Sequence, residues 1–163
     1  MGTGRVAPVR KGELMKIRDV MTANPQLCTP DSNLKDVACM MRDHDTGFIP
    51  VCDGDRITGV ITDRDMVVRS LCQGVDTSQA KVRDCMTTDI CWIQQDQDIK
   101  DAIAVMEERK IRRMLVMDEQ KRLVGVFSLG DLAEAKGIRN LAEEVLKRVS
   151  ESPKTMAHPA SRQ

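Results

Sequence analysis

An internal duplication constrains the fold of this chain more than any other feature of its sequence. Ile17–Thr22 (IRDVMT) recurs as Val82–Thr87 (VRDCMT), and Leu34–Met41 recurs as Ile99–Met106, both at an offset of about 65 residues. Gly59–Asp65 (GVITDRD) recurs as Gly125–Asp131 (GVFSLGD) one position further along, so one residue is inserted near 120–122. Three blocks in the same order indicate two copies of one unit.

Both copies predict the same succession of elements, β-α-β-β-α. Apolar residues beginning at Leu34 follow the i, i+3, i+4, i+7 spacing of one helical face, and those beginning at Ile99 repeat it. Polar residues at 31–33 and 96–98 can cap these helices, and Asp53-Gly54 between two apolar runs is a hairpin signal. The predicted helices are 34–42, 63–72, 99–108 and 129–136, and the predicted strands are 26–29, 48–52, 57–61, 91–94, 113–117 and 123–127.

A unit of this size buries little surface alone, so we expect the two copies to pack together. The expected fold class is α+β, with two β-α-β-β-α repeats forming one pseudo-two-fold module. The predicted boundaries are a flexible arm over 1–14, repeat 1 over 15–80, repeat 2 over 81–137, an amphipathic helix over 138–150 and a disordered tail over 151–163. Whether Met15 is the true start is left open.

Composition excludes several classes of protein. Lys plus Arg and Asp plus Glu both number 25, so a globally basic nucleic-acid binder is not expected. Only three aromatic residues are present, too few for a platform on which bases stack. The sequence has no apolar stretch of the roughly 20 residues that a membrane span needs, and its first residues lack the apolar core of a signal peptide. Six cysteines without a CxxC pair predict free thiols in the cytoplasm.

The paired Met-Thr starts, the strand ending in Pro50-Val51 and the two Gly-h-h-[Ser/Thr]-x-x-Asp motifs (h, hydrophobic) resemble a tandem CBS-domain pair, or Bateman module. The resemblance covers residues 15–137. The run Thr62–Arg69 is similar to that of small stand-alone bacterial CBS proteins, including hypoxic-response types. The resemblance implies an adenine nucleotide bound in a cleft between the repeats, with the motif Asp at the ribose hydroxyls and the motif Thr or Ser beside the phosphate or ribose.

The two motifs also have a purely structural interpretation. A helix start presents unpaired N–H groups and a partial positive charge, which suits a phosphate. The same positions suit capping: Thr62 and Ser128 as N-caps, with Asp65 and Asp131 in the first turn. Both interpretations stay open from the sequence.

When the family's binding residues are carried over to this sequence, the first cleft is the preferred nucleotide site. Arg112 and Arg113 occupy positions where the family places phosphate contacts, although together with Lys110 they could also be a solvated strand edge. The residues assigned to the first cleft are Thr22, Leu27, Thr46, Gly47, Arg112, Arg113, Val126, Ser128 and Asp131.

The second cleft is expected to bind more weakly. Gly47 and Phe48 stand where the first cleft has its arginines, so no phosphate clamp is expected unless Arg64 bends inward. Trp92 could stack on adenine, plug the cleft or fill the core. The residues assigned to it are Thr87, Trp92, Ile111, Phe48, Val60, Thr62 and Asp65.

The resemblance thus implies a regulatory module that binds AMP, ADP, ATP or NAD(H) and senses an energy or stress state. Catalysis is not expected, because no Ser-His-Asp set, metal-binding cluster or phosphate loop of the Walker type is present. The alternatives are a ligand-free scaffold or stress-response protein acting through dimerisation, and a redox sensor using Cys85 or Cys91. The apolar helix faces predict a homodimer. The downstream protein partner is unknown, and neither membrane nor nucleic acid is expected as a partner.

Overall fold

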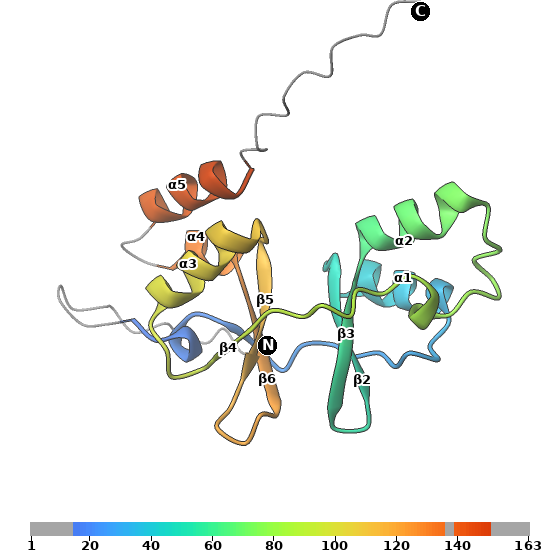
Figure 1. Cartoon of the computed structure of the whole chain (residues 1–163), viewed down its shortest axis with the longest axis horizontal. Helices are drawn as coiled ribbons and strands as arrows, with labels where there is room; N and C mark the ends of the chain where they lie inside the picture. The colour runs from blue at the N-terminus through green and yellow to red at the C-terminus, as the bar shows by residue number, and fades with distance from the viewer. Residues whose placement is uncertain (1–14, 136–138, 151–163) are drawn as a thin grey trace, which may run out of the picture.

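The computed structural model describes residues 15–135 and 139–150 (Figure 1). The expected arm over 1–14 and tail over 151–163 lie outside these residues. The 3-10 helices are η1 (Ile17–Asp19), η2 (Leu71–Gln73) and η3 (Val82–Asp84). The α-helices are α1 (Leu34–Asp43), α2 (Asp63–Arg69), α3 (Ile99–Arg109), α4 (Leu129–Glu134) and α5 (Arg139–Ser150). The strands are β1 (Thr22–Ala23), β2 (Phe48–Asp53), β3 (Arg56–Thr62), β4 (Trp92–Gln94), β5 (Arg113–Met117) and β6 (Leu123–Ser128).

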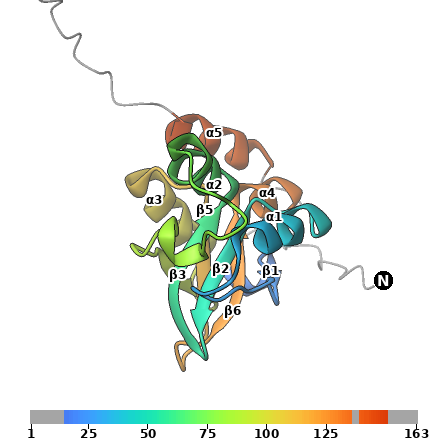
Figure 2. The ribbon, with the colours of Figure 1, turned by 90° about the vertical axis from the view of Figure 1, so that its right-hand side faces the viewer.

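The strands form two sheets, one in each half of the molecule, and the β2-β3 hairpin of the first copy is equivalent to the β5-β6 hairpin of the second. One sheet has the order β1-β6-β5-β4, and the other consists of the β2-β3 hairpin. The parallel pairing of β4 with β5 has its counterpart in a single parallel bridge between Cys28 and Val51. Both hairpins turn at the same end of the molecule, and the α-helices lie toward the other (Figures 1 and 2). The expected pair of β-α-β-β-α repeats with pseudo-two-fold symmetry is confirmed.

The beginning of each copy crosses to the other copy. Thr22 in β1 pairs with Val126 in β6, and the equivalent Thr87 pairs with Val60 in β3. In Figure 1 the segment containing η1 lies beside α3 and β4, in the half built by the second copy. Each half is therefore completed by residues from the other half.

One expected strand is reduced to a single bridge. The sequence predicts a strand over 26–29, but only Cys28 makes a bridge there, whereas the equivalent segment of the second copy forms β4. Pro25 and Pro30 flank the segment, and a proline has no N–H to give to a strand ladder.

Two apolar cores follow from this exchange of segments. The core of the second half contains Met15 and Ile17 from the first copy, packed with residues such as Ile99 and Phe127. The core of the first half contains Val82 and Cys85 from the second copy. The C-terminal helix, expected over 138–150, is observed as α5, and its Ala142, Val145 and Val149 are buried in the second core.

The motif glycines lie where the crossing segments come closest. A Cβ atom on Gly59 would be 2.6 Å from the carbonyl oxygen of Thr87, and one on Gly125 would be 2.9 Å from that of Thr22. Both distances are shorter than a carbon and a backbone oxygen tolerate, so the glycine recurs because a side chain would push the crossing segment away.

Gly59→Ala is therefore expected to lower the free energy of unfolding by about 1–3 kcal/mol through overpacking. Gly130→Ala is the matched control, because the nearest atom to a Cβ there is the Ser128 hydroxyl oxygen at 3.3 Å. Urea denaturation of both variants measures the difference. Equal tolerance at the two positions would show that the crossing segment has room to move.

Candidate functional site

The first cleft is a cavity of about 360 Å³ between β1, the end of β6 and the segment that follows α1. Six of the nine residues assigned to it line the cavity: Thr22, Thr46, Arg113, Val126, Ser128 and Asp131. Leu27, Gly47 and Arg112 do not line it. The lining also includes Asn24, Pro25, Gln26, His44, Asp45 and Phe48, which were not expected. Asn24 and Asp45 have positive φ angles of 51° and 49°, a conformation that Asn and Asp tolerate, but the sequence alone did not indicate it.

The polar groups of the first cleft are tied together around Asp131. Its Oδ2 accepts hydrogen bonds from the Ser128 hydroxyl and from the Ser128 backbone N–H, the latter at 2.7 Å. Its Oδ1 accepts a hydrogen bond from the Thr22 hydroxyl at 2.8 Å. The capping interpretation of Ser128 and Asp131 thus holds in the structure, and Thr22 of the first copy joins the same network.

The second cleft is larger, with a volume of about 640 Å³. Six of its seven expected residues line it: Phe48, Val60, Thr62, Asp65, Thr87 and Ile111. Trp92 does not line it, and its side chain is 43% exposed, so the expectation that Trp92 borders this cavity or fills the core is wrong. The residues that were not expected are Asp63, Arg64, Asp89, Cys91, Lys110, Arg112 and Arg113.

Basic side chains also line the second cleft, where no phosphate clamp was expected unless Arg64 bends inward. Arg64, Lys110, Arg112 and Arg113 all line this cavity, against three carboxylates. Arg113 is the first residue of β5, and Arg112 lies just before the strand. Arg113 lines both cavities, and Arg112 lines only the second. The first cleft retains one arginine beside Asp45 and Asp131, so the cationic character lies in the second cleft.

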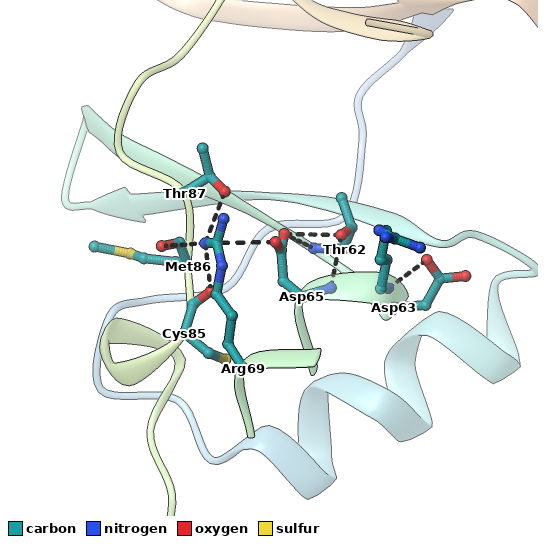
Figure 3. A network of polar contacts seen from close by, with 8 residues as sticks. Thr62, Asp63, Asp65, Arg69, Cys85, Met86 and Thr87 are labelled. Carbon is teal, nitrogen blue, oxygen red and sulfur yellow. Dashed lines mark hydrogen bonds and ion pairs between the residues drawn. The ribbon is translucent and has the colours of Figure 1, made fainter. Parts of the chain in front are cut away.

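Arg69 makes the second cleft different from the first (Figure 3). Asp65 and Thr62 form the same capping box as their counterparts, with the Thr62 hydroxyl donating to Asp65 Oδ2 at 2.7 Å. A single Arg69 nitrogen then lies 3.4 Å from Asp65 Oδ1 and donates to the Thr87 hydroxyl at 3.0 Å and the Cys85 carbonyl at 3.0 Å. The position equivalent to Arg69 in the second copy is Ala135, so Thr22 reaches Asp131 directly.

The thiol of Cys85 lies next to this network but is buried. Burial, together with the negative charges of Asp65 and Asp84, raises the pKa of Cys85. Burial and the neighbouring Cys52 raise the pKa of Cys28 to about 12. A raised pKa keeps a thiol protonated at neutral pH, and the protonated form is a poor nucleophile.

The cysteines of the native protein are therefore expected to be alkylated at different rates. Exposed Cys72 should react with iodoacetamide at pH 8, whereas Cys28 should hold on the order of 1,000-fold less thiolate than an ordinary cysteine and react correspondingly slowly. Cys85 should also lag behind Cys72. Peptide mass spectrometry over time measures each site. Rapid modification of Cys85 would instead favour the redox-sensor alternative.

Within 15–135 and 139–150, no group of three or more His, Cys, Asp or Glu side chains could hold a metal ion. Over the same residues, every helix is too short or too polar to cross a bilayer.

Two proteins of known sequence are similar to this chain over most of their length. An uncharacterised protein of Bacillus subtilis, YlbB, is 34% identical over 140 residues, which cover 85% of this chain and 93% of that protein. Hypoxic response protein 1 of Mycobacterium tuberculosis is 36% identical over 117 residues, covering 71% of this chain and 81% of that protein.

Solved structures share the fold. The crystal structure of Hypoxic Response Protein I with two coordinated zinc ions has a TM-score of 0.64 at 35% identity and covers 73% of this chain and 97% of that one. CBSX2 in complex with AMP has a TM-score of 0.63 at 22% identity, covering 80% of this chain and 97% of that one.

The family model of the CBS domain matches the chain twice, over residues 17–71 and 82–137. These ranges contain both motif glycines, both capping boxes and all of the residues that line the two cavities. The chain therefore belongs to the CBS-domain family and carries two copies of the domain.

Proposed function

We propose that this CBS pair is a regulatory module that binds an adenosine-containing nucleotide in its second cleft. The observation that carries the proposal is the convergence of Arg64, Lys110, Arg112 and Arg113 on one cavity that also contains Asp65. A cavity of about 640 Å³ lies within the range of about 300–1,000 Å³ typical of small-molecule sites. The AMP complex of the fold relative CBSX2 supports the choice of ligand class.

Each part of the ligand has a matching group in the cleft. The basic side chains offer donors to the phosphate, and arginine can bind it in a bidentate way. Asp65 accepts hydrogen bonds from the ribose hydroxyls, exchanging its contact with Arg69 for them. Phe48, Val60 and Ile111 supply the apolar lining for the base. The first cleft, with Asp131 and one arginine, suits the nucleoside portion of a ligand better than a polyphosphate.

Isothermal titration calorimetry with AMP, ADP, ATP, NADH and adenosine tests the proposal. We expect saturable binding of at least one phosphorylated ligand, tighter than adenosine, and a matching rise in the melting temperature, since a ligand of the native state must stabilise it. The absence of binding by all five ligands would favour the ligand-free scaffold.

The regulatory role itself is part of the proposal. The residues around the clefts bind and orient a nucleotide, and we assign no reaction to them. Occupancy of the second cleft would report the concentration of the nucleotide, and hence an energy or stress state, in the cytoplasm.

We further propose that the protein is a homodimer. In the first half, Val67, Val68 and Leu71 of α2 and η2 are 54%, 47% and 64% exposed, and Val75 follows at 40%. The equivalent helix of the second half, α4, has Leu129 and Leu132 buried and packs against α5. Within the described residues nothing covers the α2 face, so a second copy of the chain, meeting it through the same face, is the proposed cover.

Light scattering is expected to give twice the chain mass of 18.2 kDa at micromolar concentration. Leu71→Asp should shift the protein toward the monomer, because a charge would be buried in the interface. Leu146→Asp, at a 45% exposed leucine on α5, is the matched control and should leave the mass unchanged. A monomeric wild-type protein would contradict the proposal.

A further inference from the structure

The last turn of α5 contacts two of the basic residues that line the second cleft. Lys110 donates a hydrogen bond from its ammonium group to the backbone carbonyl of Arg148. Arg112 donates one from its guanidinium to the Ser150 hydroxyl at 3.2 Å. Both cations also line the cavity proposed for the phosphate, so the end of α5 and the ligand need the same donors.

Other contacts hold α5 along its length, and they involve neither Lys110 nor Arg112. Ala142, Val145 and Val149 are buried in the core of the second half. Arg148 forms an ion pair with Glu107 of α3 at 3.1 Å. The helix can therefore stay in place when Lys110 and Arg112 leave the Arg148 carbonyl and the Ser150 hydroxyl. The helix also lies outside both matches to the CBS family model, the second of which ends at residue 137.

Charge explains why the end of α5 attracts these cations. The carbonyl groups of a helix point toward its C-terminal end, which carries the negative end of the helix dipole. Lys110 donates to the carbonyl of Arg148, and Arg112 donates to the hydroxyl of Ser150, the last described residue of α5. Without a ligand, the C-terminal end of α5 thus accepts hydrogen bonds from Lys110 and Arg112 in the place of a bound anion.

We propose that the last turn of α5 competes with the ligand phosphate for Lys110 and Arg112. The inference rests on the proposed nucleotide binding and adds its regulation: a phosphate in the second cleft draws both cations away from the Arg148 carbonyl and the Ser150 hydroxyl. By linkage, contacts that hold the helix end weaken nucleotide binding by the same factor. The last turn of α5 then changes with ligand occupancy and can pass the signal to a partner.

Hydrogen–deuterium exchange of the full chain tests the release. AMP should speed exchange of the amides in 146–150, and adenosine, which has no phosphate, should leave them unchanged. Exchange in the middle of α5, around Ala142 and Val145, should not rise with either ligand. AMP binding without any change at 146–150 would overturn the competition and leave the proposed function intact.

Ser150→Ala tests the reciprocal effect on affinity. Removing the acceptor of Arg112 should tighten AMP binding about 2–10-fold, the range for one hydrogen bond, without changing adenosine binding. Lys147→Ala is the matched control, because Lys147 is exposed in the same turn and does not line the cavity. Unchanged AMP affinity in Ser150→Ala would overturn the inference alone, whereas the absence of any nucleotide binding in the wild type would overturn both it and the proposed function.

Discussion

Replacement of both Arg112 and Arg113 by alanine is expected to weaken AMP binding about 100-fold and to leave adenosine binding within about twofold. A hydrogen bond to a charged group contributes roughly 1.5–3 kcal/mol, and about tenfold for each arginine is a conservative figure because both side chains are exposed. Adenosine has no anion for the pair to bind, while Asp65 and the apolar lining remain. Calorimetry with two ligands on two proteins measures the ratio of affinities.

Two further variants identify the physical cause. Arg→Lys at both positions should recover only part of the loss, since a planar fork that can bind bidentately becomes a point charge. Arg56→Ala, at an exposed arginine of the β2–β3 hairpin that lines neither cavity, should leave AMP binding unchanged. Rising salt should weaken the wild type more than the double mutant. An unchanged AMP-to-adenosine ratio in the double mutant would falsify the phosphate clamp and favour a solvated strand edge.

Ile17→Ala is expected to lower the free energy of unfolding by about 2–5 kcal/mol, the usual cost of such a cavity in a core. The Ile17 side chain is fully buried, and it packs in the core of the second half although it belongs to the first copy. Backbone hydrogen bonds support the same placement, because the N–H of Ile17 donates to the carbonyl of Gln97 at 3.0 Å. Urea denaturation measures the loss.

The prediction also specifies which half of the molecule Ile17→Ala destabilises. Hydrogen exchange should rise first in α3, α4 and α5, and less in α1 and α2. Leu27→Ala, at a 46% exposed leucine of the same copy, should change stability little. Greater exchange in α1 and α2 than in α3 would show that each repeat forms its own core and that the crossing contributes little.

Local signals in the sequence located most elements and the caps of the long helices. The periodicity beginning at Leu34 and Ile99 marked α1 and α3, and polar residues ahead of them include the observed caps, Asn33 and Asp98. Both side chains accept a hydrogen bond from the backbone N–H two residues later, a contact that depends on neighbouring residues alone. The Asp-Gly turn and the β5–β6 hairpin were predictable for the same reason.

The side on which a residue faces was not predictable from neighbours in the sequence. Arg112 was expected in the first cleft, but the register of β5 against β6, in which Arg113 pairs with Ser128, leaves it lining the second. Arg69 carried no signal, because its role depends on Cys85 and Thr87, more than fifteen residues away and brought close by the crossing. Asn24 and Asp45 were also not predicted as cleft residues, because the positive φ angles with which they line the first cleft leave no clear signal in the sequence.

The sequence by itself determined that the chain contains one unit twice, which elements each unit forms, and where the motif residues Thr62, Asp65, Ser128 and Asp131 lie on their helices. These features depend on periodicity, capping and turn chemistry, which act over a few residues. Only the tertiary structure decided that the copies exchange their first segments, that the basic residues gather in the second cleft, and that α5 reaches Lys110 and Arg112. Those features depend on contacts between segments tens of residues apart, where the burial of apolar surface and the register of strands select the partner.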